Sequence, residues 1–140
     1  MKKTLKTLVL CGVIASTAAI ADSGLMTQLD DRKWTQINGT PMSFSMIWGD
    51  RDTGPYAMYL KLPAGFSASE HAHTYSYRGI TLQGQWQHSY AGERKTLGPG
   101  GYVFQPGNAW HADSCTGKQD CILMIQQDGK GDAHFPHSDH

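Results

Sequence analysis

Two stretches of the chain decide its fold, GFSASEHAHTYSYRGITLQG at residues 65–84 and GGYVFQPGNAWH at residues 100–111. In the first, His71 and His73 lie two residues apart, so an extended strand would point both imidazoles to one face. In the second, a Pro-Gly-Asn turn leads into a strand that carries His111. A closed β-barrel brings such strand ends together at its mouth, where small ligands bind. The three histidines are therefore candidate ligands of a divalent transition metal (iron, manganese, nickel, copper or zinc), since these metals accept neutral imidazole.

The residues around these two stretches predict short strands separated by turns. Sixteen Gly and six Pro punctuate runs of alternating, β-branched and aromatic residues. The expected strands are Ser43–Trp48, Ala57–Leu62, Ser69–Tyr75, Arg78–Leu82, Gln85–Tyr90, Arg94–Leu97, Tyr102–Gln105, Trp110–Ser114 and Ile122–Gln127. Only Leu25–Leu29 suggests a brief helical turn. The predicted class is all-β, with a sandwich or barrel architecture.

The first stretch resembles the first motif of the cupin superfamily. That motif is a Gly, five residues, His-x-His, three or four residues, Glu, six residues and a final Gly. Gly65, His71, His73 and Gly84 stand at the corresponding positions. The position of the family's Glu, which is its fourth metal ligand, holds Tyr77 instead.

The second stretch resembles the second motif of the same superfamily, and the two motifs together cover roughly residues 65–115. This motif is a Gly, five residues, Pro-x-Gly-x-x-His, three residues and Asn. Gly100, Pro106 and His111 fit its spacing, whereas the inner Gly is displaced to Gly107 and the terminal Asn is replaced by Cys115. The resemblance implies a double-stranded β-helix (jelly-roll) barrel with a metal inside. It implies little about activity, because one fold hosts many reactions.

Three interpretations of the missing Glu stay open. The site holds its metal through three histidines and keeps open positions, as the three-histidine cupin oxygenases do. Alternatively, Tyr77 coordinates the metal or a ligand bound to it. In the third interpretation the metal is lost and the barrel binds an organic ligand, with Tyr75, Tyr77 and Arg78 as pocket residues.

Two more polar residues are candidates for the surroundings of the metal. Asp113 has the strand parity of His111, so its carboxylate could orient that ring or act as an acid or base. His88 is a candidate outer partner or extra ligand, although neither motif includes it. The alternatives are a solvent-facing aspartate and an ordinary core or surface histidine.

The first 21 residues read as a cleavable signal peptide. Lys2, Lys3 and Lys6 precede an apolar segment that ends in Ala19-Ile20-Ala21. Cleavage would leave a single domain over residues 22–140, with a core at about 42–128 and a flexible tail at 129–140 that contains His134, His137 and His140. The expected location is the bacterial periplasm or the cell exterior, and no later segment is long and apolar enough to span a bilayer.

Cleavage would leave two cysteines, Cys115 and Cys121, and a net charge of −3, from 12 − 3 = 9 basic and 12 acidic residues. In an oxidising compartment a disulfide between the two is expected, with free thiols or a Cys–His metal site as alternatives. The chain has no basic run and no excess of positive charge, so a nucleic-acid partner is not expected.

Three functions are consistent with these observations. The first is a metal-dependent enzyme acting on a small molecule, most concretely an oxygenase of a small organic acid or phenol. The second is a periplasmic ligand-binding or metal-handling protein without turnover. The third is a structural cupin with a dry barrel. Pairing of two copies through an edge strand, giving a homodimer, is a further expectation.

Overall fold

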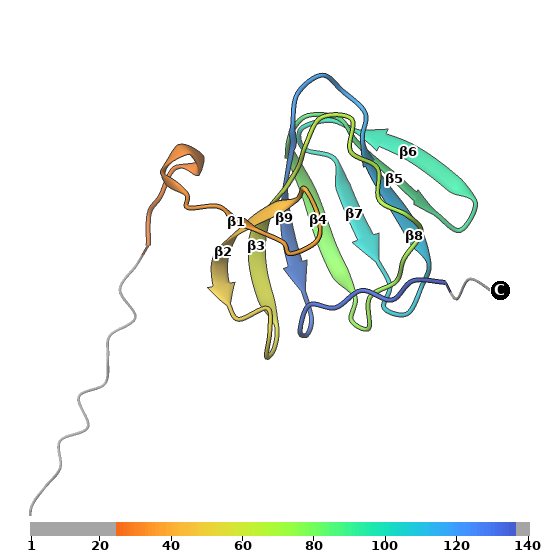
Figure 1. The fold of residues 1–140 in the computed structure, drawn as a ribbon, viewed down its shortest axis with the longest axis horizontal. Helices are drawn as coiled ribbons and strands as arrows, with labels where there is room; N and C mark the ends of the chain where they lie inside the picture. The colour runs from red at the N-terminus through yellow and green to blue at the C-terminus, as the bar shows by residue number, and fades with distance from the viewer. Residues whose placement is uncertain (1–24, 137–140) are drawn as a thin grey trace, which may run out of the picture.

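The computed structural model describes residues 25–136, whose regular secondary structure is almost entirely β-strand (Figure 1). The elements are the short 3₁₀ helix η1 (Leu29–Asp31) and strands β1 (Thr35–Gln36), β2 (Ser43–Gly49), β3 (Tyr56–Leu62), β4 (Tyr77–Gln83), β5 (Trp86–Tyr90), β6 (Glu93–Leu97), β7 (Tyr102–Gln105), β8 (His111–Cys115) and β9 (Cys121–Gln127). The predicted signal peptide lies outside the described residues. No helix in the described part is long and apolar enough to cross a membrane.

The strands form two antiparallel sheets. The larger sheet has the order β1-β2-β3-β9-β4-β7, and the smaller has the order β6-β5-β8. Strand β9 lies between β3 and β4 although these precede it by many residues, which is the long-range pairing of a jelly roll. The prediction of an all-β jelly-roll barrel is confirmed.

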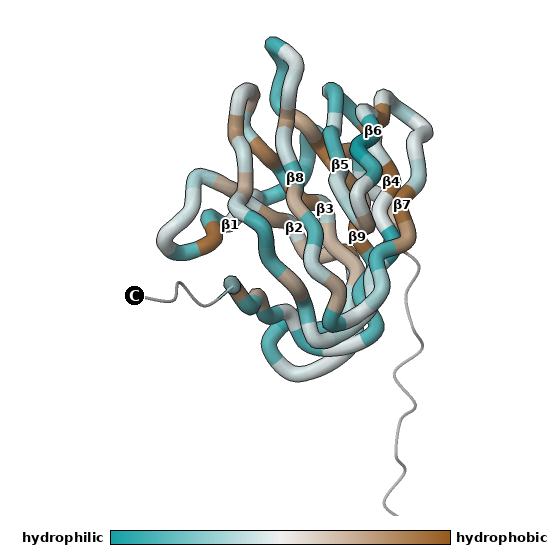
Figure 2. Tube along the Cα trace, turned by 90° about the vertical axis from the view of Figure 1, so that its right-hand side faces the viewer, coloured by the Kyte–Doolittle hydropathy of each residue, from teal (hydrophilic) through white to brown (hydrophobic). Residues whose placement is uncertain are grey.

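Apolar side chains from both sheets fill the space between them. Trp86 of β5 is 1% exposed and packs with residues of the larger sheet such as Leu123 and Ile125. Gly79 in β4 makes room for this ring, because a Cβ there would lie 2.8 Å from Cη2 of Trp86. Strand β6, at the edge of the smaller sheet, is hydrophilic and almost wholly exposed (Figure 2). The core therefore lies between the two sheets and contains side chains from β4, β5 and β8.

The predicted strand Ser69–Tyr75 does not form as a continuous element. Residues 65–71 instead run along β8, with N–H···O bonds from Ala68 to Asp113 and in both directions between His71 and His111. The chain then bends at residues 74–75, and β4 begins only at Tyr77. The expected strand was wrong because these bends interrupt the extended run that its alternating residues predicted.

Residues 129–136, expected as part of a flexible tail, pack against the barrel. Ala72 and His134 exchange two backbone hydrogen bonds of 2.9 and 2.8 Å, and the Gly131 amide donates to the Arg51 carbonyl at 2.6 Å. A Cβ at Gly129 would collide with the ring of Tyr75. This segment, called the C-terminal strap below, can be followed as the dark-blue chain after β9 in Figure 1. Residues 137–140 lie outside the described part.

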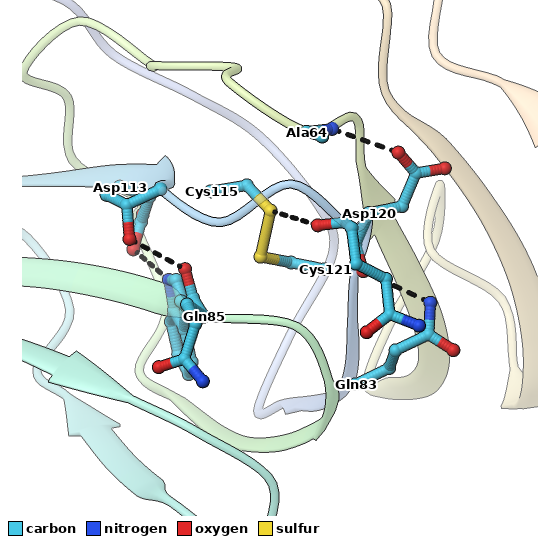
Figure 3. Close-up of a disulfide and its surroundings, with 10 residues drawn as sticks. Ala64, Gln83, Gln85, Asp113, Cys115, Asp120 and Cys121 are labelled. Atoms are coloured by element: carbon cyan, nitrogen blue, oxygen red, sulfur yellow. Dashed lines mark hydrogen bonds between the residues drawn. A yellow bond between two sulfur atoms is a disulfide. The ribbon is translucent and has the colours of Figure 1, made fainter.

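A disulfide joins Cys115, the last residue of β8, to Cys121, the first residue of β9 (Figure 3). Both cysteines are buried, at 1% and 0% exposure. Asp120 fixes the turn between them, because its carboxylate accepts the Ala64 amide and its carbonyl accepts the Gln83 side chain. The disulfide therefore links the smaller sheet to the larger one a few residues from His111.

Candidate metal centre

The structure brings His71, His73 and His111 together at one point inside the barrel. One ring nitrogen of each lies within 4.8 Å of one ring nitrogen of both others. The ring centroids are 4.3 Å apart for His71 and His111, 5.0 Å for His71 and His73, and 5.2 Å for His73 and His111. His111 is 1% exposed and His71 is 9% exposed, so the cluster is largely shielded from water.

Backbone hydrogen bonds hold the two histidine-bearing segments in this position. The amides and carbonyls of His71 and His111 pair at 2.9 Å in both directions, and the Asn108 amide donates to the His73 carbonyl at 2.7 Å. Asn108 has a φ of 57°, in the left-handed region that Asn tolerates better than most residues. It thus supplies the backbone conformation that the cupin motif obtains from Gly at this position. The neighbouring Gly107 allows close packing, since a Cβ there would lie 2.5 Å from the Thr74 carbonyl oxygen.

Backbone carbonyls determine which ring nitrogen of each histidine carries its proton. Nδ1 of His71 lies 2.8 Å from the Ser69 carbonyl, Nδ1 of His111 lies 3.2 Å from the Ala109 carbonyl, and Nδ1 of His73 contacts the Asp132 carbonyl. A carbonyl oxygen only accepts hydrogen bonds, so each Nδ1 is the donor and each neutral ring keeps a lone pair on Nε2. This arrangement, with Nδ1 held by an outer acceptor, is typical of metal-ligating histidines.

Burial keeps the rings of His73 and His111 neutral. It lowers the pKa of His111 to about 4, against the opposing charge of Asp113, and it lowers the pKa of His73 against its hydrogen bond to Asp132. Nε2 of His111 is buried and has no hydrogen-bond partner within residues 25–136. The three rings thus bring one ring nitrogen each to a common point. Such a point fits an ion that accepts electron pairs, and imidazole ligands suit a divalent transition metal.

Asp113 faces the cluster from β8. Its Oδ1 accepts hydrogen bonds from Trp86 Nε1 at 2.7 Å and from His88 Nδ1 at 2.8 Å. Its Oδ2 lies 3.5 Å from Nε2 of His111 and 3.9 Å from Nε2 of His71. Burial opposes ionisation of this carboxyl, but the hydrogen bond and charge of His88 outweigh it and hold the pKa below its ordinary value.

His88 lies beside the cluster as an outer partner. Its Nδ1 faces Asp113 and its Nε2 lies 3.1 Å from Oε1 of Gln105. Both ring nitrogens are therefore engaged, so His88 has no free lone pair for a metal. Its centroid is 5.4 Å from that of His111. Of the two roles expected from the sequence, the geometry fits the outer partner rather than the extra ligand.

The three other pocket candidates separate in space. Tyr77 is 4% exposed, and its ring lies edge-on to His73 and His111 with centroids 5.5 and 5.7 Å away. Burial, with a contribution from Asp113, raises the pKa of its phenol well above 10, so the hydroxyl stays protonated. Tyr75 is 39% exposed because the bends before β4 turn it outwards, and Arg78 lies on the surface in an ion pair with Asp128 at 2.8 Å.

Sequence reasoning missed three residues that position the site. The Asp132 carbonyl of the C-terminal strap holds His73, and the Asp132 carboxylate accepts hydrogen bonds from the amide and hydroxyl of Thr74. Trp86 forms a hydrogen bond with Asp113, and Gln105 forms one with His88. Strand parity places Trp86 and His88 on one face, but it does not show that Trp86 would bind Asp113. The strap contains two glycines in a polar stretch and carries no comparable signal.

A family model described as the ChrR cupin-like domain matches residues 22–129, which is most of the chain. A search of curated proteins finds no match. Among solved structures, an RmlC-like cupin from Shewanella frigidimarina shares 20% identity with a TM-score of 0.61, over 76% of this chain and 91% of that chain. The polyketide cyclase RemF from Streptomyces resistomycificus shares 16% identity with a TM-score of 0.66, over 84% and 89%.

A further similar structure is that of Rhodobacter sphaeroides SigE in complex with the anti-sigma ChrR. It shares 21% identity with a TM-score of 0.58, over 72% of this chain and 52% of that chain. Identities this low show the fold alone. The family match, the two motifs and the barrel agree, and the chain therefore belongs to the cupin superfamily, in the family of ChrR cupin-like domains.

Proposed function

We propose that the chain binds one divalent transition metal through His71, His73 and His111 and is a metal-dependent enzyme acting on a small organic molecule. The most concrete form is an oxygenase of a small organic acid or phenol. The observation that carries the proposal is the convergence of one ring nitrogen from each of three histidines whose Nδ1 atoms are held by backbone carbonyls. Bound there, a transition metal would supply Lewis acidity and, if it is redox-active, reactivity towards dioxygen.

The side chains around the cluster suit a catalytic site. Three imidazoles leave room in the coordination sphere for another donor and for a substrate. The protonated hydroxyl of Tyr77 can donate a hydrogen bond to a substrate oxygen, and its ring forms a wall beside His73 and His111. The ionised Asp113, whose Oδ2 lies 3.5 Å from Nε2 of His111, can accept a proton or a hydrogen bond.

Export to the periplasm or the cell exterior is part of the proposal. The Lys-rich start, the apolar segment and the small residues at Ala19 and Ala21 support it. The disulfide between Cys115 and Cys121 is in keeping with an oxidising compartment.

A second candidate is a metal- or ligand-binding cupin without turnover. The family match favours it, because the family is described by ChrR and one similar solved structure contains the anti-sigma ChrR bound to SigE. In this role the metal site would stabilise or regulate a binding surface instead of turning over a substrate.

The test is metal analysis of the untagged protein, followed by oxygen consumption with a panel of small organic acids and phenols. We expect about one metal ion per chain, loss of that metal in His111→Ala, and its retention in the matched control His134→Ala, which removes a half-exposed histidine outside the cluster. A protein without metal contradicts the proposed site. Stoichiometric metal without any turnover favours the binding function.

A further inference from the structure

The carboxylate of Asp113 lies beside the three histidines, at a strand position that the cupin motifs do not use for metal. Tyr77 occupies the position of the usual ligand Glu, so β4 provides no carboxylate. Asp113 follows His111 by two residues on β8, and strand alternation turns both side chains to the same face. Oδ2 of Asp113 lies 3.5 Å from Nε2 of His111 and 3.9 Å from Nε2 of His71, so the carboxylate is next to these two rings.

The two oxygens of Asp113 have different surroundings. Oδ1 takes two N–H hydrogen bonds from β5, at 2.7 and 2.8 Å, which fix the plane of the carboxylate. Oδ2 is directed at Nε2 of His111 and Nε2 of His71. A carboxylate held through one oxygen, with the other free to bind, is pre-organised in the manner of a metal ligand with an outer hydrogen-bond partner.

The polarity around Oδ2 calls for a cation. Because Nδ1 of each ring donates to the carbonyl of Ser69 or Ala109, Nε2 carries the lone pair when the ring is neutral. A carboxylate oxygen 3.5 and 3.9 Å from two lone pairs is unfavourable unless a positive charge lies between them. Donors that share one ion at about 2.0–2.2 Å are themselves roughly 3–3.5 Å apart. The 3.5 Å separation from His111 falls in this range, and the 3.9 Å separation from His71 exceeds it, so binding would draw Oδ2 and His71 slightly closer.

A chain of hydrogen bonds behind Oδ1 holds the Asp113 side chain in place. Gln105 donates from Nε2 to the carbonyls of Ala109 and Pro106, so its Oε1 is the acceptor facing His88. His88 Nε2 is then a donor, and Nδ1 is hydrogen-bonded to Asp113. His88, Gln105 and Trp86 thus form a fixed support for Asp113, which gives the buried polar groups of β5 and β7 their hydrogen-bond partners.

We propose that Asp113 Oδ2 is the fourth protein donor of the metal site and replaces the carboxylate that cupins usually place at the position of Tyr77. The site is then three histidines and one aspartate, with the aspartate contributed by β8 instead of β4. The inference rests on the proposed metal site and adds to it a residue that the motif does not assign to the metal.

The first experiment compares Zn²⁺ affinity of the wild-type chain with that of Asp113→Asn, by competition with a chromophoric chelator. Glu70→Gln is the matched control, because Glu70 is adjacent to His71 but exposed. Outer-sphere partners of metal ligands cost about 10–100-fold in affinity when mutated, so loss of a direct donor is expected to cost on the order of 100-fold or more. We expect that loss in Asp113→Asn and a change of less than about 3-fold in the control. A loss below about 10-fold in Asp113→Asn overturns the proposal.

The second experiment needs no variant and decides the case if Asp113→Asn does not fold. It is a crystal structure of the wild-type chain loaded with Zn²⁺ alone. An Oδ2–zinc distance within about 2.5 Å supports the proposal, and a longer distance overturns it even if the variant binds weakly. The proposed metal site fails separately: in that case the wild-type chain itself binds no Zn²⁺ and His111→Ala changes nothing.

Discussion

Acidification of the metal-free protein tests the neutral state of His111. In the unfolded chain this ring titrates near its ordinary pKa of 6.5, whereas in the folded protein burial lowers the pKa to about 4. Between these values the unfolded state binds a proton that the folded state does not, so the free energy of unfolding must fall as the pH falls. Above 6.5 the contribution of His111 is fully present, and below 4 no more is lost.

The size of this loss follows from the same two values. One pKa unit corresponds to about 1.36 kcal/mol, so a difference of about 2.5 units amounts to roughly 3 kcal/mol. His73, whose pKa burial also lowers, adds to the loss in the same direction. Against a total stability of about 5–15 kcal/mol, a change of this size is readily measured.

The assay is urea denaturation at pH 7, 6, 5 and 4 in the presence of a chelator. The wild-type chain is compared with His111→Gln, which cannot titrate, and with His134→Gln, which keeps the buried ring. We expect the stability of the wild type relative to His111→Gln to decrease by roughly 3 kcal/mol between pH 7 and pH 4. The same decrease is expected for His134→Gln relative to His111→Gln.

A stability difference between wild type and His111→Gln that stays constant within about 1 kcal/mol over this range would refute the reasoning. It would mean that the folded protein accommodates a protonated His111. Nε2 would then have a partner in solution, and the convergence of lone pairs that supports the metal site would be lost.

Two further predictions concern glycines that allow close packing. Gly129→Val pushes the C-terminal strap away from the ring of Tyr75 and so weakens the contact between the Asp132 carbonyl and His73. We therefore expect Zn²⁺ affinity to fall about 10-fold in a competition titration. Gly79→Val drives a side chain into Trp86 and is expected to lower the urea-unfolding free energy by about 1–3 kcal/mol. Gly54→Val, where the added atoms meet open space, is the control for both and should change neither quantity.

The strands and the candidate ligands could be predicted because their signals are local. Turn residues and alternating side chains placed strand Tyr102–Gln105 at the observed bounds and Ile122–Gln127 within one residue of β9. The same local rule gave the parity of Asp113 with His111. Residue types and spacing also predicted the ligand set His71, His73 and His111, since a barrel must bring these strand ends together.

The remaining features depend on contacts between residues far apart in the chain. The bends at residues 74–75 ended the expected strand and separated Tyr75 from Tyr77, which were both candidate pocket residues. The C-terminal strap is polar and glycine-containing, and only its pairing with Ala72 and its contact with His73 give it a fixed position. No pattern within the strap predicts partners that lie about 60 residues earlier.

The sequence by itself determined the fold class, most of the strand positions and the three candidate histidines, because alternation, turn chemistry and motif spacing act over a few residues. Only the tertiary structure decided which nitrogen of each ring is free, which oxygen of Asp113 faces the cluster, and that His88 supports Asp113. The physical reason is that a side chain's protonation and direction are set by the donors and acceptors around it, and those come from distant strands that meet only in the closed barrel.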